Sequence, residues 1–400
     1  MQSDIQANPD FTAVPPGTHS FSQMERVRHG RPVALALEEE LALLGKGRVF
    51  LISNQSLANS EARREVVRVL GSRLVGGYEG VSAHSPRTCV LEAAEAARSV
   101  KADLVVALGG GSVIDAAKAT LLCLRHGYSE VAQLDAHANQ RQRDLGRAPA
   151  DAAQWMRMVA IPTTLSAAEF ASSAGLTDPA RGMKEAFMQP MMMPQSVIFD
   201  PAMTRSTPLA LLLSTGMKAV DHAVERVTSA SAGPFSDALS LLALRLLHRA
   251  LPELTARPDD LQVRASLQYG AFMSVAGIAS GTAVNVSHAI GHVLGGHAGV
   301  PHGHTTGVLL PAVLRWSLDS TTGPQQKLRD ALGTEHASAA DAIEALTRSL
   351  GLPCTLRELG LQRSDLPEIA RKTMHESLLS NSRKAVASPG DIEEILELAW

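Results

Sequence analysis

Hydrophobic positions divide the chain into two parts with different periodicity. Between residues 48 and 162, short apolar runs alternate with stretches in which apolar residues recur every three or four positions. The continuous apolar runs are typical of buried strands, and they cover residues 48–54, 103–110 and 156–164. The helical repeat is carried by "EARREVVRVLG" and "PRTCVLEAAEAARSV". This alternation predicts a mostly parallel sheet with helices packed against it.

The pattern changes after Pro208, where long apolar-periodic segments separated by short Gly, Pro or Asp turns continue to the C-terminus. Residues 175–201 are rich in turn residues and methionine, and they favour a hairpin followed by a connector. We expect a loose polar arm at residues 1–20, an α/β domain at 21–198 and an all-helical domain at 199–400.

Composition narrows the classes of partner. The 400 residues have 19% charged side chains and a net charge of −3, so the chain has no signature of nucleic-acid binding. Cys89, Cys123 and Cys354 are scattered singly with no CxxC spacing, so they indicate neither a disulfide framework nor a zinc–thiolate site and fit a reducing cytoplasm. No uncharged apolar run approaches the length of a membrane span, so we expect no membrane partner.

Two segments after predicted strands are candidate ligand sites. Gly109 to Gly111 stand between a strand and a helix that opens at Ser112, where exposed N–H groups bind phosphate oxygens well. A tight strand-to-helix turn explains the same glycines. Thr163, Thr164 and Ser166 follow the next strand, at the sheet edge where ligands bind. Taken by themselves, these hydroxyls are better explained by simple N-capping of a helix.

The histidines indicate a binding or catalytic cluster. His288 and His292 are one helical turn apart, and His302 follows after a loop that permits a fold-back. On a separate predicted helix, residues 214–225, Lys218 precedes His222 by one turn on the same face. A lysine beside candidate metal ligands requires an explanation.

A series of motifs resembles a known family. "GGGSVIDAAK", "IPTTLSAAE", "FDPAMTRSTP", "GMKAVDHAVE", "SHAIGHVLGG" and "VPHGH" occur in that order. Together they resemble the iron-containing (group III) alcohol dehydrogenase family, and most nearly its maleylacetate reductase branch. The resemblance extends from about residue 25 to the C-terminus.

The resemblance implies a dehydroquinate synthase-like fold: a Rossmann-like dinucleotide-binding domain, an all-helical domain, and NADH or NADPH in the cleft between them. Asn54 stands where an acidic side chain often excludes the extra phosphate of NADP, so its neutral side chain leaves both cofactors open. The resemblance also implies a homodimer. The cofactor-binding residues expected from the motifs are Asn54, Gly109, Gly110, Gly111, Ser112, Asp115, Thr163, Thr164, Ser166 and Lys184.

The resemblance further implies a metal site with one substitution. Metal-dependent members hold Fe²⁺ or Zn²⁺ with an aspartate and three histidines, and His222, His288 and His302 match the histidine positions. Lys218 occupies the aspartate position, and His292 matches a further histidine near the substrate. An ammonium beside a dication is repelled by several kcal/mol at an effective dielectric of about 20. Three imidazoles still bind a metal if the lysine turns away or loses its proton.

The leading interpretation is a metal-independent NAD(P)H-dependent reductase of a small oxo or unsaturated carboxylic acid, with maleylacetate to 3-oxoadipate as the specific reaction. Lys218 and His292 are the candidates to polarise the substrate or supply a proton, with His222, His288 and His302 around the pocket. One alternative is a metal-dependent alcohol dehydrogenase or aldehyde reductase. Another is a catalytically silent nucleotide-binding protein, in which Lys218 extends to solvent.

Overall fold

The structure is a computed structural model of the whole chain. Some residues have no described placement, and the side chains of Met183 and His302 are likewise not described. The described residues are 18–83, 85–140, 147–178, 181, 183–300, 302–333 and 336–400.

The N-terminal half contains a six-stranded sheet in which every adjacent pair is parallel, with strand order β1-β8-β5-β4-β2-β3. Two further strands, β6 and β7, form a separate antiparallel hairpin. The strands are β1 (Arg26–His29), β2 (Val49–Ile52), β3 (Leu74–Tyr78), β4 (Leu104–Gly109), β5 (Arg157–Pro162), β6 (Ser173–Asp178), β7 (Met183–Met188) and β8 (Ser196–Phe199).

Side chains on the central strands alternate between two cores. On β2, Phe50 and Ile52 join the core that contains helices α3 (Arg87–Ser99) and α4 (Gly111–His126). The intervening Val49 and Leu51 join the core beneath α1 (Val33–Leu44) and α2 (Glu61–Leu70). The sheet is therefore covered on both faces, which is why its central strands are continuously apolar.

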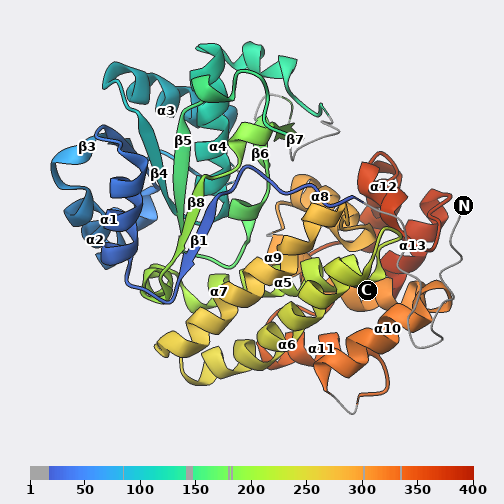
Figure 1. Ribbon diagram of the computed structural model, residues 1–400. Helices are drawn as coiled ribbons and strands as arrows, with labels where there is room; N and C mark the ends of the chain where they lie inside the picture. Colours follow the sequence, from blue (N-terminus) through green and yellow to red (C-terminus); the bar gives the residue numbers. More distant parts are fainter. Residues whose placement is uncertain are drawn as a thin grey trace, which may run out of the picture.

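Helices make up the C-terminal half, and the described residues after β8 contain no strand (Figure 1). No described helix is both long enough and apolar enough to span a membrane. The helices are α5 (Leu209–Thr228), α6 (Pro234–Ala256), α7 (Leu261–Ala276), α8 (Val286–Ala298), α9 (His302–Trp316), α10 (Leu318–Leu332), α11 (Ala339–Ser349), α12 (Leu366–Thr373) and α13 (Pro389–Leu398).

The expected fold class is confirmed, with three strands added. The predicted strands correspond to β2, β4 and β5, and the expected hairpin is β6–β7. The added strands β1, β3 and β8 are only four or five residues long. Within the predicted arm, residues 1–17 lie outside the described residues. The Ser20 amide donates a 2.6 Å hydrogen bond to the Ala279 carbonyl.

One hydrophobic core continues from the sheet into the helical half. Leu165, just after β5, belongs to the same buried cluster as Met217 and Val220 on α5. Phe170 stacks on Phe272 of α7 with ring centroids 4.5 Å apart. In Figure 1, α5 correspondingly lies beside the sheet half. This packing brings the carboxyl edge of β5 next to α5, where the candidate site lies.

Candidate active site

Helix α5 carries four ionisable residues spaced so that they share one side of the helix. Lys218, Asp221, His222 and Glu225 stand at positions i, i+3, i+4 and i+7. The last three are at least nine-tenths buried, whereas Lys218 is partly buried. Burying two carboxylates costs free energy unless other groups bind them.

The two carboxylates are bound mainly by residues at the start of α8. Glu225 accepts hydrogen bonds from the Ser287 amide at 2.6 Å and from the Asn285 amide at 2.9 Å. Asp221 Oδ2 accepts hydrogen bonds at 3.1 Å from the hydroxyls of Ser287 and Thr306. Burial, together with the charge of Glu225, raises the pKa of Asp221 well above its ordinary value. The shift extends the pH range over which Asp221 keeps its proton beyond that of an exposed aspartate.

His288 lies against both carboxylates. Its Nδ1 is 2.7 Å from Glu225 Oε2 and 3.3 Å from Asp221 Oδ2. Burial lowers the pKa of His288, although the hydrogen bond to Glu225 opposes that shift. The ring stacks on His222, with centroids 4.8 Å apart and planes 19° apart. The structure thus brings together two of the predicted histidines.

His292 lies at the margin of this cluster. The His292 ring centroid is 6.5 Å from that of His288. The His292 side chain is 47% exposed and its Nδ1 is 3.3 Å from Glu376 Oε2, so solvent reaches it. His302 is the first residue of α9, but its side chain is not among those described.

Lys218 lies in a desolvated environment with both positive and negative groups nearby. Burial, with a smaller effect from the charge of Lys184, lowers the pKa of Lys218 to about 8. Three carboxyl groups oppose this shift: Asp115, Asp221 and Glu169. The amine is therefore mostly protonated at neutral pH, while remaining able to release its proton just above it.

Glu169 is a second titratable group near Lys218 whose pKa is shifted by burial. It is 1% exposed, and its Oε2 is among the buried side-chain atoms without a hydrogen-bond partner. Burial raises the pKa of Glu169 to about 7, against the opposing charges of Lys118 and Lys218. Lys118 Nζ donates hydrogen bonds to the carbonyls of Ala168 and Ser173, so the backbone on both sides of Glu169 is bound.

The sheet edge beside α5 has the form of a phosphate-binding site. Helix α4 follows Gly110, whose lack of a side chain leaves the first N–H groups without a side-chain cap. A Cβ at Gly110 would lie 2.8 Å from Thr164 Cγ2, and one at Gly111 would lie 3.1 Å from Ser166 Oγ. The hydroxyls of Thr164 and Ser166 are buried without a hydrogen-bond partner. These features fit a dinucleotide pyrophosphate.

The other predicted cofactor residues surround this edge. Gly109 ends β4, and its carbonyl accepts a 3.0 Å hydrogen bond from the Thr163 amide. The Ser112 carbonyl accepts a hydrogen bond from the Ser85 hydroxyl at 2.8 Å. Asn54 follows β2 at the same edge, where its Oδ1 accepts a hydrogen bond from Ser56.

The hairpin brings two more of these residues together. Asp115 Oδ2 accepts a 3.1 Å hydrogen bond from the Gly175 amide on β6. Lys184 on β7 extends across Gly175, close enough that a Cβ there would meet its side chain. The structure therefore places Lys184 and Asp115 on adjoining elements, both within electrostatic range of Lys218.

Three site residues were missed by reasoning from the sequence: Asp221, Glu225 and Glu169. Asp221 and Glu225 place two carboxylates beside the predicted histidines, from the next turns of α5. Their spacing from Lys218 and His222 in "MKAVDHAVE" was a usable signal, since all four share a helix face. Glu169 had no comparable signal in the sequence.

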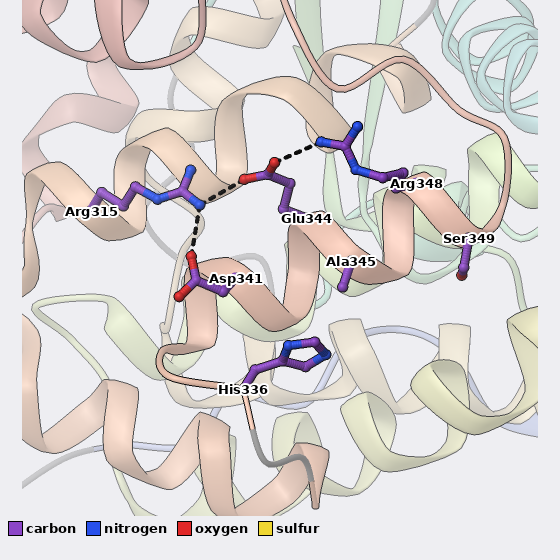
Figure 2. A pocket seen from close by; sticks show the side chains of 7 residues that line it. All are labelled: Arg315, His336, Asp341, Glu344, Ala345, Arg348 and Ser349. Carbon is purple, nitrogen blue, oxygen red and sulfur yellow. Dashed lines mark hydrogen bonds and ion pairs between the residues drawn. The ribbon is translucent and has the colours of Figure 1, made fainter.

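A pocket of about 590 Å³ opens elsewhere on the surface, between α9 and α11 (Figure 2). Its charged groups largely neutralise each other. Arg315 pairs with Asp341 at 2.8 Å and with Glu344 at 2.6 Å, and Glu344 also pairs with Arg348 at 2.9 Å. None of the candidate site residues lines this pocket, so we assign it no role in the chemistry.

Comparison with known proteins identifies the family. The sheet half and the helical half each match a family model of one class of oxidoreductase. The model "Iron-containing alcohol dehydrogenase" matches residues 25–201, and "Fe-containing alcohol dehydrogenase family, C-terminal" matches residues 212–400. The chain belongs to the iron-containing alcohol dehydrogenase family.

Individual relatives agree with this assignment. Maleylacetate reductase 1 of Cupriavidus pinatubonensis is 28% identical over 86% of this chain and 87% of its own length. The structure of maleylacetate reductase from Agrobacterium tumefaciens has a TM-score of 0.80 at 24% identity, covering 96% of this chain and 98% of that one. Sulfoacetaldehyde reductase from Bifidobacterium kashiwanohense, solved with NAD⁺, has a TM-score of 0.83 at 22% identity, covering 95% and 98%. The two structures establish the shared fold.

Proposed function

We propose that this oxidoreductase is an NAD(P)H-dependent reductase of a small oxo or unsaturated carboxylic acid, with maleylacetate to 3-oxoadipate as the specific reaction, and that it works without a bound metal. The observation that carries the proposal is the setting of Lys218. Its partly buried amine lies among carboxyl groups beside the phosphate-binding edge of the sheet, with a pKa of about 8.

The dinucleotide would be held by groups of this chain that lack other partners. Backbone N–H groups at the start of α4 bind the pyrophosphate, and the hydroxyls of Thr164 and Ser166 supply further donors. Lys184 adds a positive charge from the hairpin. The bound nicotinamide supplies the hydride. All remaining steps concern the substrate and its protons, and these belong to the side chains on α5 and α8.

Lys218 performs the charge stabilisation that a metal ion supplies in other family members. As hydride reaches the substrate, negative charge develops on the substrate oxygen, and a nearby ammonium stabilises it by a hydrogen bond. A pKa of about 8 keeps the donor charged at neutral pH while making proton release easy. His292, which is half exposed, is available to exchange protons with solvent.

The residues at the family's own ligand positions disfavour the ion that the resemblance implies. The position of the expected carboxylate ligand holds the amine of Lys218, which repels a dication. Of the carboxylates that the structure supplies, Glu225 is engaged by two backbone amides and His288. This donor set supports the metal-independent mechanism.

A metal-dependent dehydrogenase is the second candidate, and one observation favours it. Potential ligand atoms of Asp221, Glu225 and His288 all lie within 4.8 Å of one another. Two carboxylates and an imidazole suit Fe²⁺ or Zn²⁺ chemically. About one metal per chain after purification without chelator would support this candidate.

The decisive assay follows NADH and NADPH oxidation with maleylacetate, with and without chelator. We expect turnover that the chelator does not reduce. Lys218→Met should lower kcat by roughly 10²- to 10³-fold, since an oxyanion donor is lost. Wild-type activity should also fall as the pH rises through about 8, because the ammonium is then lost.

Lys46→Met is the matched control, since Lys46 is an exposed loop lysine away from the site. It should retain full activity. Activity that appears only after iron or zinc is added contradicts the metal-free mechanism. NAD(P)H binding without turnover on any carbonyl compound would instead indicate a silent nucleotide-binding protein.

A further inference from the structure

Glu225 connects the start of α8 to the imidazole of His288. Its Oε1 accepts a hydrogen bond from the Ser287 amide at 2.6 Å. Its Oε2 accepts one from the Asn285 amide at 2.9 Å and lies 2.7 Å from His288 Nδ1. The carboxylate is 1% exposed, so these three groups determine its position.

The chemistry of this contact assigns the proton on the ring. A carboxylate that already accepts two amide hydrogen bonds offers only lone pairs to His288, so Nδ1 must carry a hydrogen. In a neutral imidazole with Nδ1 protonated, Nε2 holds the lone pair and accepts hydrogen bonds. The choice between the two nitrogens is thereby made by a residue of α5.

Asp221 is a weaker competitor for the same nitrogen. Its Oδ2 lies 3.3 Å from His288 Nδ1, compared with 2.7 Å for Glu225. The same oxygen already accepts hydrogen bonds from the hydroxyls of Ser287 and Thr306. Glu225 is therefore the group that orients the ring.

We propose that Glu225 is a positioning residue that holds His288 in the Nδ1–H tautomer, so that His288 presents Nε2 to the site as an acceptor. This deepens the proposed function and rests on it for the consequence that follows. With His288 acting as an acceptor, the hydrogen-bond donor for a developing oxyanion is Lys218. One buried carboxylate thus both binds the N-terminus of α8 and divides the donor and acceptor roles between two side chains.

The test is the tautomer of His288, read by long-range ¹H–¹⁵N spectra of histidine-labelled full-length protein, with Glu225→Ala and Glu225→Gln as variants. The wild type should show the Nδ1–H pattern for His288. Glu225→Ala should change the tautomer, and Glu225→Gln, which keeps the side-chain volume, tests the same effect if the alanine variant does not fold. Both variants should lower kcat about tenfold or more with little change in the KM for the cofactor.

Asp260→Ala is the matched control. Asp260 accepts hydrogen bonds from the amides of Gln262 and Val263 at the start of α7, outside the site. Its loss should reduce stability without altering the His288 spectrum or kcat. A wild-type His288 protonated at Nε2 alone, or an unchanged spectrum in both Glu225 variants, overturns the proposal. The spectrum requires no turnover. If the protein does not reduce maleylacetate, the proposed function is rejected, but the tautomer of His288 can still be determined.

Discussion

Lys218 and Glu169 are ionisable side chains whose burial moves their pKa values toward neutrality from opposite sides. The amine is lowered to about 8 and the carboxyl is raised to about 7. Each is within electrostatic range of the other. Pairs of groups with pKa values shifted toward neutrality are typical of functional sites, because a group that titrates near neutral pH exchanges protons readily.

The raised pKa of Glu169 predicts a pH-dependent contribution to stability. Its pKa rises from 4.5 when unfolded to about 7 when folded, so its contribution is fully present below pH 4.5 and is lost as the pH rises through 7. Between pH 5 and 8, the free energy of unfolding of the wild type should fall by roughly 2 to 3 kcal/mol relative to Glu169→Gln. Urea unfolding at several pH values measures this difference.

Glu95→Gln is the control for this prediction, since the Glu95 side chain is 71% exposed on α3. It should leave the pH dependence of stability unchanged. If the free energy of unfolding depends on pH in the same way for the wild type and Glu169→Gln, the pKa of Glu169 is not raised in the folded protein.

At the scale of elements, the start of α4 and the segment after β5 depend on each other. Gly110 and Gly111 are close to Thr164 and Ser166, so the helix N-terminus and the hydroxyls face one space. A side chain on Gly110 would intrude between them. The requirement for glycine at position 110 is one of space and not of backbone conformation, because its φ of −84° is one that any residue adopts.

Gly110→Ala should therefore weaken cofactor binding. The added Cβ would lie 2.8 Å from Thr164 Cγ2, which forces the segment after β5 to move. We expect the KM for NAD(P)H to rise about tenfold or more, with a smaller change in kcat, as measured by initial rates. Gly47→Ala, where a Cβ meets no atom within 4 Å, should change neither constant. Equal kinetics in both variants would contradict the assigned phosphate position.

At the scale of the whole molecule, the site exists only because the two halves of the chain meet. The sheet half supplies the phosphate-binding edge, Glu169 and Lys184, while α5 and α8 supply Lys218, His222 and His288. The continuous core between Leu165 and α5 holds these parts together. Binding of a dinucleotide should therefore stabilise the entire protein.

Cofactor binding should raise Tm in proportion to the logarithm of its concentration. At 100 times Kd, the expected gain is about 2.7 kcal/mol, which corresponds to roughly 3 °C for a chain of this size. Thermal unfolding with NADH and with NADPH measures the gain and also ranks the two cofactors. Gly110→Ala should show a smaller gain at the same concentration. If neither NADH nor NADPH changes Tm, the proposed cofactor binding is contradicted.

The fold was largely predictable because the central strands are buried on both faces. Val105, Val106 and Ala107 of β4 are all fully buried, which produces the continuous apolar run that the sequence displays. The two edge strands lack this signal. The sequence of β1 is "RVRH", and its two arginines form ion pairs with Glu40. β3 contains two adjacent glycines. Edge strands have a neighbour on one side only, so their composition is less constrained.

Local sequence determined the elements, the glycine turn before α4 and the helical spacing that places Lys218 and His222 on one face, because each depends on neighbours within one or two turns. Tertiary structure decided which buried charges share a space. Asp221 and Glu225 resemble ordinary helix-surface acids until α8 packs its first amides against Glu225 and the Ser287 hydroxyl against Asp221. The pKa of Glu169 is raised only when the chain buries this carboxyl beside α4 and α5. Desolvation and long-range contact set their chemistry, and neither is encoded in local spacing.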